Sequence, residues 1–281
     1  LCAMLLPAMT GWRLRPAALA VALVVGGSDI VVASTTAQCV VCGEDADTAC
    51  PCENCMGFAG GTVVHINAGV AGLVAAIMLG KRRGYGVENM APHNLVLSLI
   101  GASMLWVGWF GFNPGSSLGM SSTQHRLDAS AAAMTTAVSA SAAAAVVVIS
   151  SLIRSRGKTV NVLAVANGLL AGLVAITGGC DVIDPGLSAV VGAVSAAIYY
   201  GASLLCQRFG VDDVVDAFAV HGAGGLWGCV AVGLFHRTSG LFTHGKWDQL
   251  GVQSLGGVIL AGLSSFFVSA ACLLLKRFGM L

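Results

Sequence analysis

Long apolar stretches recur along the chain and are separated by short polar connections. Seven of them contain few or no charged residues: 58–80, 94–115, 129–153, 159–179, 185–206, 216–235 and 252–275. A helix rises about 1.5 Å per residue and the hydrocarbon core of a bilayer is about 30 Å thick, so each stretch predicts a membrane-spanning helix. The pattern therefore predicts an all-α, polytopic membrane helix bundle with about seven transmembrane helices in residues 58–281.

The composition supports this class of protein. The chain is 56% hydrophobic and 10% charged, with a mean hydropathy of +0.85. Its 38 glycines among 281 residues favour a compact bundle, because small residues let helix backbones approach closely in lipid. The net charge of +1 gives no indication of nucleic acid binding.

Basic residues between the spans predict the orientation, since cytoplasmic loops collect Lys and Arg. With the first span running inward, nine basic residues face the cytoplasm: Lys81, Arg82, Arg83, Arg154, Arg156, Lys158, Arg208, Lys276 and Arg277. Only three face outward, namely Arg126, Arg237 and Lys246. The sequence thus predicts an integral protein of the plasma membrane with a cytoplasmic C-terminus.

Residues 1–57 have a different character. Arg13 and Arg15 precede an apolar run and then small polar residues, which is typical of a secretory signal peptide; a short extra helix is the alternative. A cysteine-rich segment follows, with Cys39, Cys42, Cys50, Cys52 and Cys55. The predicted outer location favours disulfides or no defined role, and a zinc site is the alternative. The expected division is a leader and Cys-rich segment in 1–57 and a transmembrane domain in 58–281.

Two histidines interrupt the apolar spans. His65 and His221 are each preceded by valine and followed four residues later by glycine. A polar group without a partner in hydrocarbon costs several kcal/mol, so each ring needs a partner or a wet path. The two spans run in opposite directions, which fits equivalent helices of an inverted repeat. Counting along straight helices leaves the rings about 13 Å apart, but a shift of two to four residues at the helix ends absorbs most of this distance, and we predict that the two rings lie beside each other. A packing role is the alternative.

Two longer blocks are more specific than these spacings. They are GGTVVHINAGVAGLVAAIMLGKRRGYGVENMAPHNLVLSLIGASMLWVGWFGFNPGS and VDDVVDAFAVHGAGGLWG. Both blocks resemble the Amt/MEP/Rh ammonium transporter family, and the likeness extends from about residue 58 to 275. The resemblance implies an eleven-helix protomer, usually a trimer with one narrow pore per subunit, which conducts ammonium or ammonia through the membrane without a cofactor or metal.

The resemblance also assigns roles to individual residues. The twin pore histidines correspond to His65 and His221, and a phenylalanine of the gate above them corresponds to Phe112. The hydroxyl that helps hold ammonium in the outer vestibule corresponds to Ser116, and Trp109 matches an aromatic residue near the inner pore. Independently of the family, Asp213 and Asp216 are expected to cap or anchor the inner end of the sixth helix.

The departures from the family pattern leave alternatives open. The family has four or five helices before the His65 block, and its aspartate just before FAGG is Gly57 here. A truncated ammonium-transporter-like fold that is inactive as a lone chain is therefore expected. The alternative is a transport-dead subunit or ammonium sensor that associates with full-length members, as a homotrimer or mixed oligomer. A bis-histidine haem protein is a third hypothesis. No nucleophile is accompanied by a base and an orienting group, so no enzyme is predicted.

Overall fold

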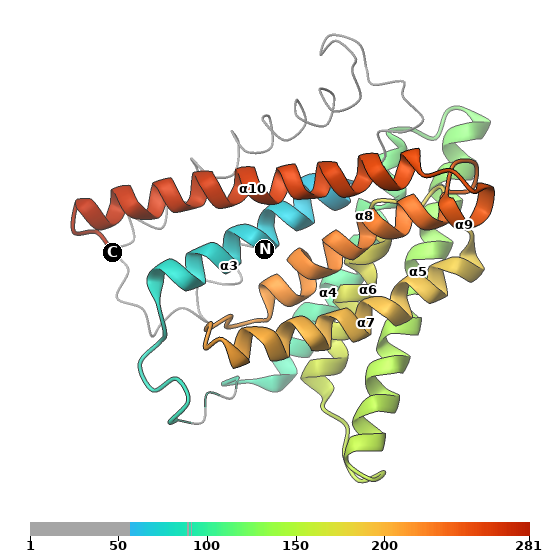
Figure 1. Cartoon of the computed structure of the whole chain (residues 1–281). Helices are drawn as coiled ribbons and strands as arrows, with labels where there is room; N and C mark the ends of the chain where they lie inside the picture. The colour runs from blue at the N-terminus through green and yellow to red at the C-terminus, as the bar shows by residue number, and fades with distance from the viewer. Residues whose placement is uncertain (1–56, 89, 91) are drawn as a thin grey trace.

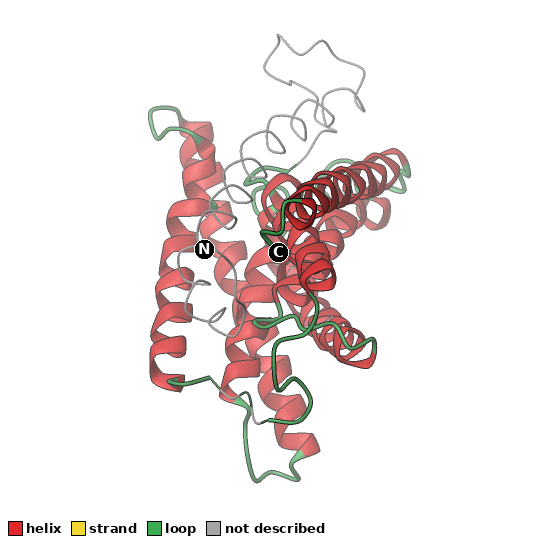
Figure 2. Ribbon diagram, turned by 90° about the vertical axis from the view of Figure 1, so that its left-hand side faces the viewer, coloured by secondary structure: helices red, strands yellow, loops and turns green. Residues whose placement is uncertain are grey.

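Every regular element in the computed structural model is a helix over the residues that it describes, which are 57–281 except 89 and 91 (Figure 1). The elements in chain order are η2 (Gly61–Ile66), α3 (Asn67–Leu79), α4 (Leu95–Phe112), η3 (Pro114–Ser117), α5 (Thr123–Arg154), α6 (Val162–Thr177), α7 (Pro185–Arg208), η4 (Phe218–Ala223), α8 (Gly224–Phe235), α9 (Leu241–His244) and α10 (Asp248–Arg277). Figure 2 shows the same described part as helices joined by loops. The predicted all-α class is confirmed.

Six helical segments of the described part are long and apolar enough to cross a membrane: Gly61–Leu79, Leu95–Ser117, Thr123–Arg154, Pro185–Arg208, Phe218–Phe235 and Asp248–Arg277. The seventh predicted span, 159–179, corresponds to α6, which has only 16 residues. Helix α6 contacts α4, α5, α7 and α8 as well as η2 and η4. Its apolar composition therefore reflects a central position in the bundle.

Small residues set the spacing of α5, α6 and α7. A Cβ atom on Gly192 of α7 would overlap with the carbonyl oxygen of Ser139 on α5. The hydroxyl of the same serine donates a hydrogen bond to the carbonyl oxygen of Gly172 on α6, at 2.7 Å. Close backbone approach and interhelical hydrogen bonds hold helices together where lipid supplies no hydrophobic drive. This explains Gly172 and Gly192, which lie where α6 and α7 contact α5.

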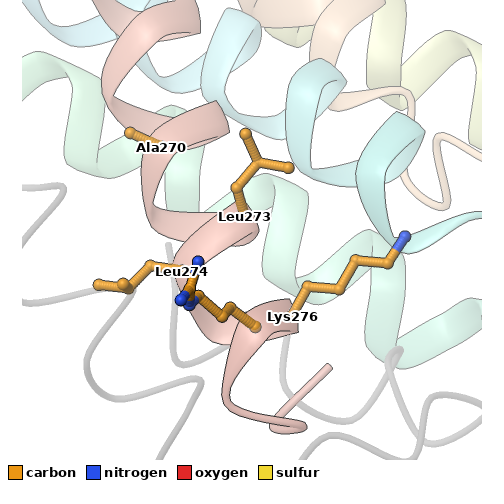
Figure 3. A pocket seen from close by; sticks show the side chains of 5 residues that line it. Ala270, Leu273, Leu274 and Lys276 are labelled. Carbon is orange, nitrogen blue, oxygen red and sulfur yellow. The ribbon is translucent and has the colours of Figure 1, made fainter.

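Helix α10 lies along α3 on one side of the bundle and also contacts η2 and α8 (Figure 1). The hydroxyl of Ser264 on α10 donates to Oδ1 of Asn67 on α3, at 2.7 Å. Helix α10 thus covers the segment that contains His65. A surface depression at its C-terminal end is shown in Figure 3 and is lined by Ala270, Leu273, Leu274, Lys276 and Arg277. All of these belong to α10, so the depression does not coincide with the histidines.

Nine of the ten cysteines fall into two groups. The predicted disulfide or zinc segment, Cys39 to Cys55, lies outside the described residues, and the division at residue 57 stays a prediction. Cys180, Cys206, Cys229 and Cys272 are buried free thiols. Buried cysteines of this kind pack as small apolar side chains.

Candidate functional site

Both histidines lie in short π-helical turns. His65 is in η2, which leads directly into α3, and His221 is in η4, which leads directly into α8. A π turn holds more residues than an α turn and therefore rotates its side chains relative to the helix that follows. Such turns are rare, and many of them occur at functional sites. The shared sequence context of the two histidines thus corresponds to a shared local structure.

The two imidazole rings lie side by side. Nδ1 of His65 is 3.2 Å from Nδ1 of His221, and the ring centroids are 5.3 Å apart with an interplanar angle of 24°. At this distance one nitrogen donates and the other accepts, which requires complementary tautomers. The predicted adjacency of the two rings is confirmed, whereas the separation of about 13 Å counted along straight helices is wrong. The helices cross here, and both rings lie on π turns.

Two aromatic residues of α4 pack against His65. The ring of Trp109 stacks on the imidazole, with centroids 5.3 Å apart and planes 15° apart. Phe112 meets the same imidazole edge-on at 5.9 Å. Nε1 of Trp109 donates to Oγ1 of Thr177 at 3.1 Å, which fixes the indole. The structure places Trp109 directly against His65, and its position near the inner pore stays a prediction.

Ser116 lies after Phe112 in the sequence, in the short helix η3 that follows α4. Its hydroxyl donates to the carbonyl oxygen of Phe112 at 2.9 Å, which holds the turn after α4. Between these two residues, Nδ2 of the fully buried Asn113 donates to Oγ1 of Thr136 on α5, at 2.9 Å. Asn113 was missed by the sequence analysis, although an amide at the end of an apolar span was a signal for such an anchor.

Asp213 lies five residues before η4 begins at Phe218. Its carboxylate accepts hydrogen bonds from the backbone N–H groups of Ala217 and Phe218, both at 2.8 Å. Burial raises the pKa of Asp213, against these hydrogen bonds, which lower it. The contacts agree with the expected capping at this end of the histidine helix.

Asp216 anchors the same end of the helix through side chains. One carboxylate oxygen accepts from the hydroxyl of Ser203 at 2.8 Å. The other accepts from the Tyr199 hydroxyl at 3.1 Å and from Nδ2 of Asn167 at 3.2 Å. Asp216 has a φ of 55°, a left-handed conformation that is uncommon outside glycine. Three donors from α6 and α7 thus hold a strained residue just before η4.

A salt bridge missed by the sequence analysis joins the loops near this end. The Arg82 guanidinium donates two hydrogen bonds to the Asp212 carboxylate, at 2.7 and 2.8 Å. The backbone N–H of Arg82 donates a third to the same carboxylate, at 2.9 Å. Burial alone raises the pKa of Asp212, but the hydrogen bonds from Arg82 lower it below its usual range. The basic loop after α3 and the acidic sequence before η4 were signals for this contact, but 130 residues separate its two members.

Two polar atoms of η2 make no hydrogen bond within the described part of the chain. They are Nε2 of His65 and Oγ1 of Thr62, and both are buried. Buried polar atoms usually have a partner, so such atoms in a membrane bundle suggest a small polar ligand or water. The direct contact between the two Nδ1 atoms also leaves no space for an iron atom between the rings, which argues against the haem hypothesis.

These features define a polytopic helical membrane protein with a pair of imidazoles held between two of its helices. The profile of the Ammonium Transporter Family matches residues 35–281. The chain belongs to this family, as the sequence resemblance implied.

Individual relatives agree with this assignment. The chain is 42% identical over 183 residues to the ammonium transporter of Bacillus subtilis, covering 65% of this chain and 43% of that protein. It is 38% identical over 231 residues to the ammonium transporter of Aquifex aeolicus, with coverage of 80% and 52%. The chain therefore spans about half the length of these relatives.

Solved structures give the same result. Candida albicans Mep2 matches with a TM-score of 0.81 and 27% identity, over 96% of this chain and 60% of that one. A structure named Sensor Amt Protein matches with a TM-score of 0.71 and 32% identity, over 80% and 56%. The described helices thus have the arrangement found in part of these proteins.

Proposed function

We propose that this chain takes part in the transmembrane passage of ammonium or ammonia, with His65 and His221 as the paired imidazoles of a hydrophobic pore. The observation that carries the proposal is the contact of 3.2 Å between their Nδ1 atoms inside an apolar bundle. Membership of the ammonium transporter family supports ammonium as the substrate. Two adjacent imidazoles in lipid-spanning helices are costly unless they serve a polar substrate.

The chemistry of the surrounding residues fits such a substrate. Ring faces stabilise a cation without a carboxylate, and Trp109 and Phe112 supply two rings beside His65. A hydroxyl such as that of Ser116 can accept a hydrogen bond from ammonium. Stripping a hydrated ion in an apolar constriction is costly, so loss of a proton lowers the barrier. Paired imidazoles donate and accept hydrogen bonds, and can therefore bind ammonia and relay the proton. Potassium has no proton to lose and is excluded.

A second candidate function is a transport-dead subunit or an ammonium sensor that associates with full-length family members. Two observations favour it. One structural relative is named a sensor, and Gly57 replaces the aspartate that the family resemblance implies at the recruitment site. In either case we propose a homotrimer or mixed oligomer in the plasma membrane, with the C-terminus in the cytoplasm as the basic residues predict.

Uptake of methylammonium in cells that lack ammonium transport tests the proposal. We compare this chain with a chimera that carries the first five helices of a full-length relative joined at Phe58. We expect little uptake from the chain, because the family resemblance assigns the upper gate and the outer aromatic residues to the preceding helices. The chimera is expected to restore measurable uptake.

Histidine variants of the chimera give the matched controls. His221→Ala is expected to lose most of the uptake, whereas His244→Ala, in the short helix α9, is expected to keep it. A well-folded chimera without uptake would favour the sensor or dead-subunit function. Strong uptake by the chain alone would show that its own oligomer completes the pore.

A further inference from the structure

The two histidine helices contact each other through glycines placed in the same way on both. Gly69 follows His65 by four residues, and Gly225 follows His221 by four residues. A Cβ atom on Gly69 would overlap with the backbone nitrogen and Cα of Gly222, the residue directly after His221. A Cβ atom on Gly225 would lie 3.1 Å from the backbone nitrogen of Ile66, the residue directly after His65. Each glycine therefore packs against the backbone beside the opposite histidine.

We propose that Gly69 and Gly225 are positioning residues that set the separation of the two imidazoles. Backbone atoms of a π turn cannot rotate away as a flexible side chain does. A methyl group at position 69 therefore forces the two helices apart at the level of the rings. A hydrogen bond of 3.2 Å is already near the upper limit of useful distances, so a small displacement breaks it.

The two contacts differ in severity, which gives the proposal a graded expectation. The Gly69 contact is a backbone overlap, whereas Gly225 has its nearest atoms at 3.0 Å, on the side chain of Ile66. Alanine at position 69 must displace the helix, but alanine at position 225 needs a shift of only a few tenths of an ångström. The effect on the imidazole pair is therefore expected to be large for the first substitution and partial for the second.

The structure supplies two matched controls. Gly192→Ala creates an equally severe backbone overlap, with Ser139, but between α7 and α5. Gly72→Ala lies on the same helix as Gly69 and places its Cβ 3.6 Å from the Cβ of Ala217, an ordinary contact. The first variant measures what a packing defect does elsewhere in the bundle. The second measures what an added methyl group does on α3.

The test is a nitrogen–nitrogen correlation spectrum of the full chain in lipid, with ¹⁵N-labelled histidine and solid-state nuclear magnetic resonance. A cross peak between Nδ1 of His65 and Nδ1 of His221 reports their separation, and His65→Gln assigns it. We expect Gly69→Ala to abolish the cross peak and Gly225→Ala to weaken it several-fold. Gly192→Ala is expected to keep it despite a lower melting temperature, and Gly72→Ala to leave both unchanged.

Opposite results would overturn the proposal. A cross peak that persists in Gly69→Ala or is unchanged in Gly225→Ala shows that the glycines do not set the separation. A folded Gly192→Ala variant without the cross peak shows that any packing defect has the same effect. Should Gly69→Ala fail to fold, the graded loss in Gly225→Ala decides.

The importance of this spacing for ammonium passage rests on the proposed function. The spectrum does not depend on it, so an intact cross peak in a chimera without uptake would reject the transport function alone.

Discussion

The two histidine-bearing elements have the same plan but are anchored by different groups. Turn η4 begins with the Asp213 cap and the Asp216 network, so side-chain carboxylates hold the helix of His221. Turn η2 begins after Gly60, which has a φ of 80° and provides no side-chain cap. Its leading segment is held by backbone instead: the N–H groups of Phe58 and Ala59 donate to carbonyl oxygens at the end of α6, at 3.1 and 3.3 Å.

We call η4 with the segment before it the His221 half, and η2 with the segment before it the His65 half. The difference in anchoring predicts which substitutions each half tolerates. The His221 half depends on particular side chains, and the loss of one leaves buried donors without an acceptor. The His65 half depends on close backbone approach, since a Cβ atom on Gly61 would lie 2.9 Å from the backbone nitrogen of Gly178. Polar substitutions should therefore damage the first half most, and added carbon atoms the second.

The largest expected effect concerns the carboxylate network of the His221 half. Asp216→Ala removes the carboxylate that accepts hydrogen bonds from Tyr199, Ser203 and Asn167. It also leaves alanine, which has no polar side chain, at a φ of 55°. Unsatisfied donors cost about 1–3 kcal/mol each when buried, and partial relaxation is expected, so we expect a loss of about 3 kcal/mol. Chemical unfolding of the chain in detergent, followed by circular dichroism, measures this loss.

Two further variants at the same position separate the causes. Asp216→Asn keeps one carbonyl acceptor and tolerates a positive φ, so we expect it to lose less than half as much stability. Asp216→Gly removes the side chain but relieves the backbone strain. If glycine restored the stability of the native chain, the hydrogen bonds of Asp216 would contribute no more than the backbone strain costs, and the contrast between the two halves would fail.

Much of this arrangement could be predicted from the sequence, because apolar length decides membrane spans. The seven predicted stretches all correspond to helices, and the shared Val-His context correctly indicated related elements. Helix α6 is shorter than predicted, since the apolar stretch 159–179 includes flanking residues that form its polar cap and the turn after it. Apolar composition cannot distinguish a helix in contact with lipid from one surrounded by other helices.

The finer geometry of the site could not be predicted. Both π turns depend on tertiary packing, and without them a count along straight helices misplaced the rings. The stacking of Trp109 on His65 depends on how α4 crosses the bundle, which no local pattern specifies. The contact of Arg82 with Asp212 closes a long sequence separation, and only its charges were visible beforehand.

A smaller effect is expected at the backbone anchor of the His65 half, at the end of α6, and depends on pH. Asp181 lies three residues after the Gly178 carbonyl that receives Phe58. Burial raises the pKa of Asp181 to about 6. The nearby Asp128 adds to this rise, and Arg237 compensates part of it. Because this pKa is raised in the folded chain, the contribution of Asp181 to stability is fully present below the unfolded value of 3.8 and is lost as the pH rises through about 6.

Asp181→Asn removes this dependence. The raised pKa corresponds to roughly 3 kcal/mol at most, and partial exposure reduces the expected gain of the variant to about 1–2 kcal/mol above pH 7. At pH 4 the variant and the native chain should be equally stable. Melting temperatures from pH 4 to pH 8 test this, with Asp184→Asn as the control, because its ion pair with Arg237 is half exposed. A difference that stays constant across this range would contradict the assigned cause.

The smallest expected effect would make the two halves alike by giving η2 the carboxylate that it lacks. Gly57 precedes the turn in which Gly60 N–H donates to the Gly57 carbonyl at 2.7 Å, and the buried Thr62 hydroxyl has no acceptor within the described part of the chain. Gly57→Asp brings an acceptor to this N-terminal end, where the helix dipole also favours a negative charge. We expect a gain of about 1 kcal/mol in unfolding free energy.

Gly57→Asn keeps the acceptor without the charge and should give about half of that gain, whereas Gly57→Ala tests backbone entropy alone. If alanine stabilises the chain as much as aspartate does, the backbone anchoring of η2 is already sufficient, and the missing side-chain cap is not what distinguishes the two halves.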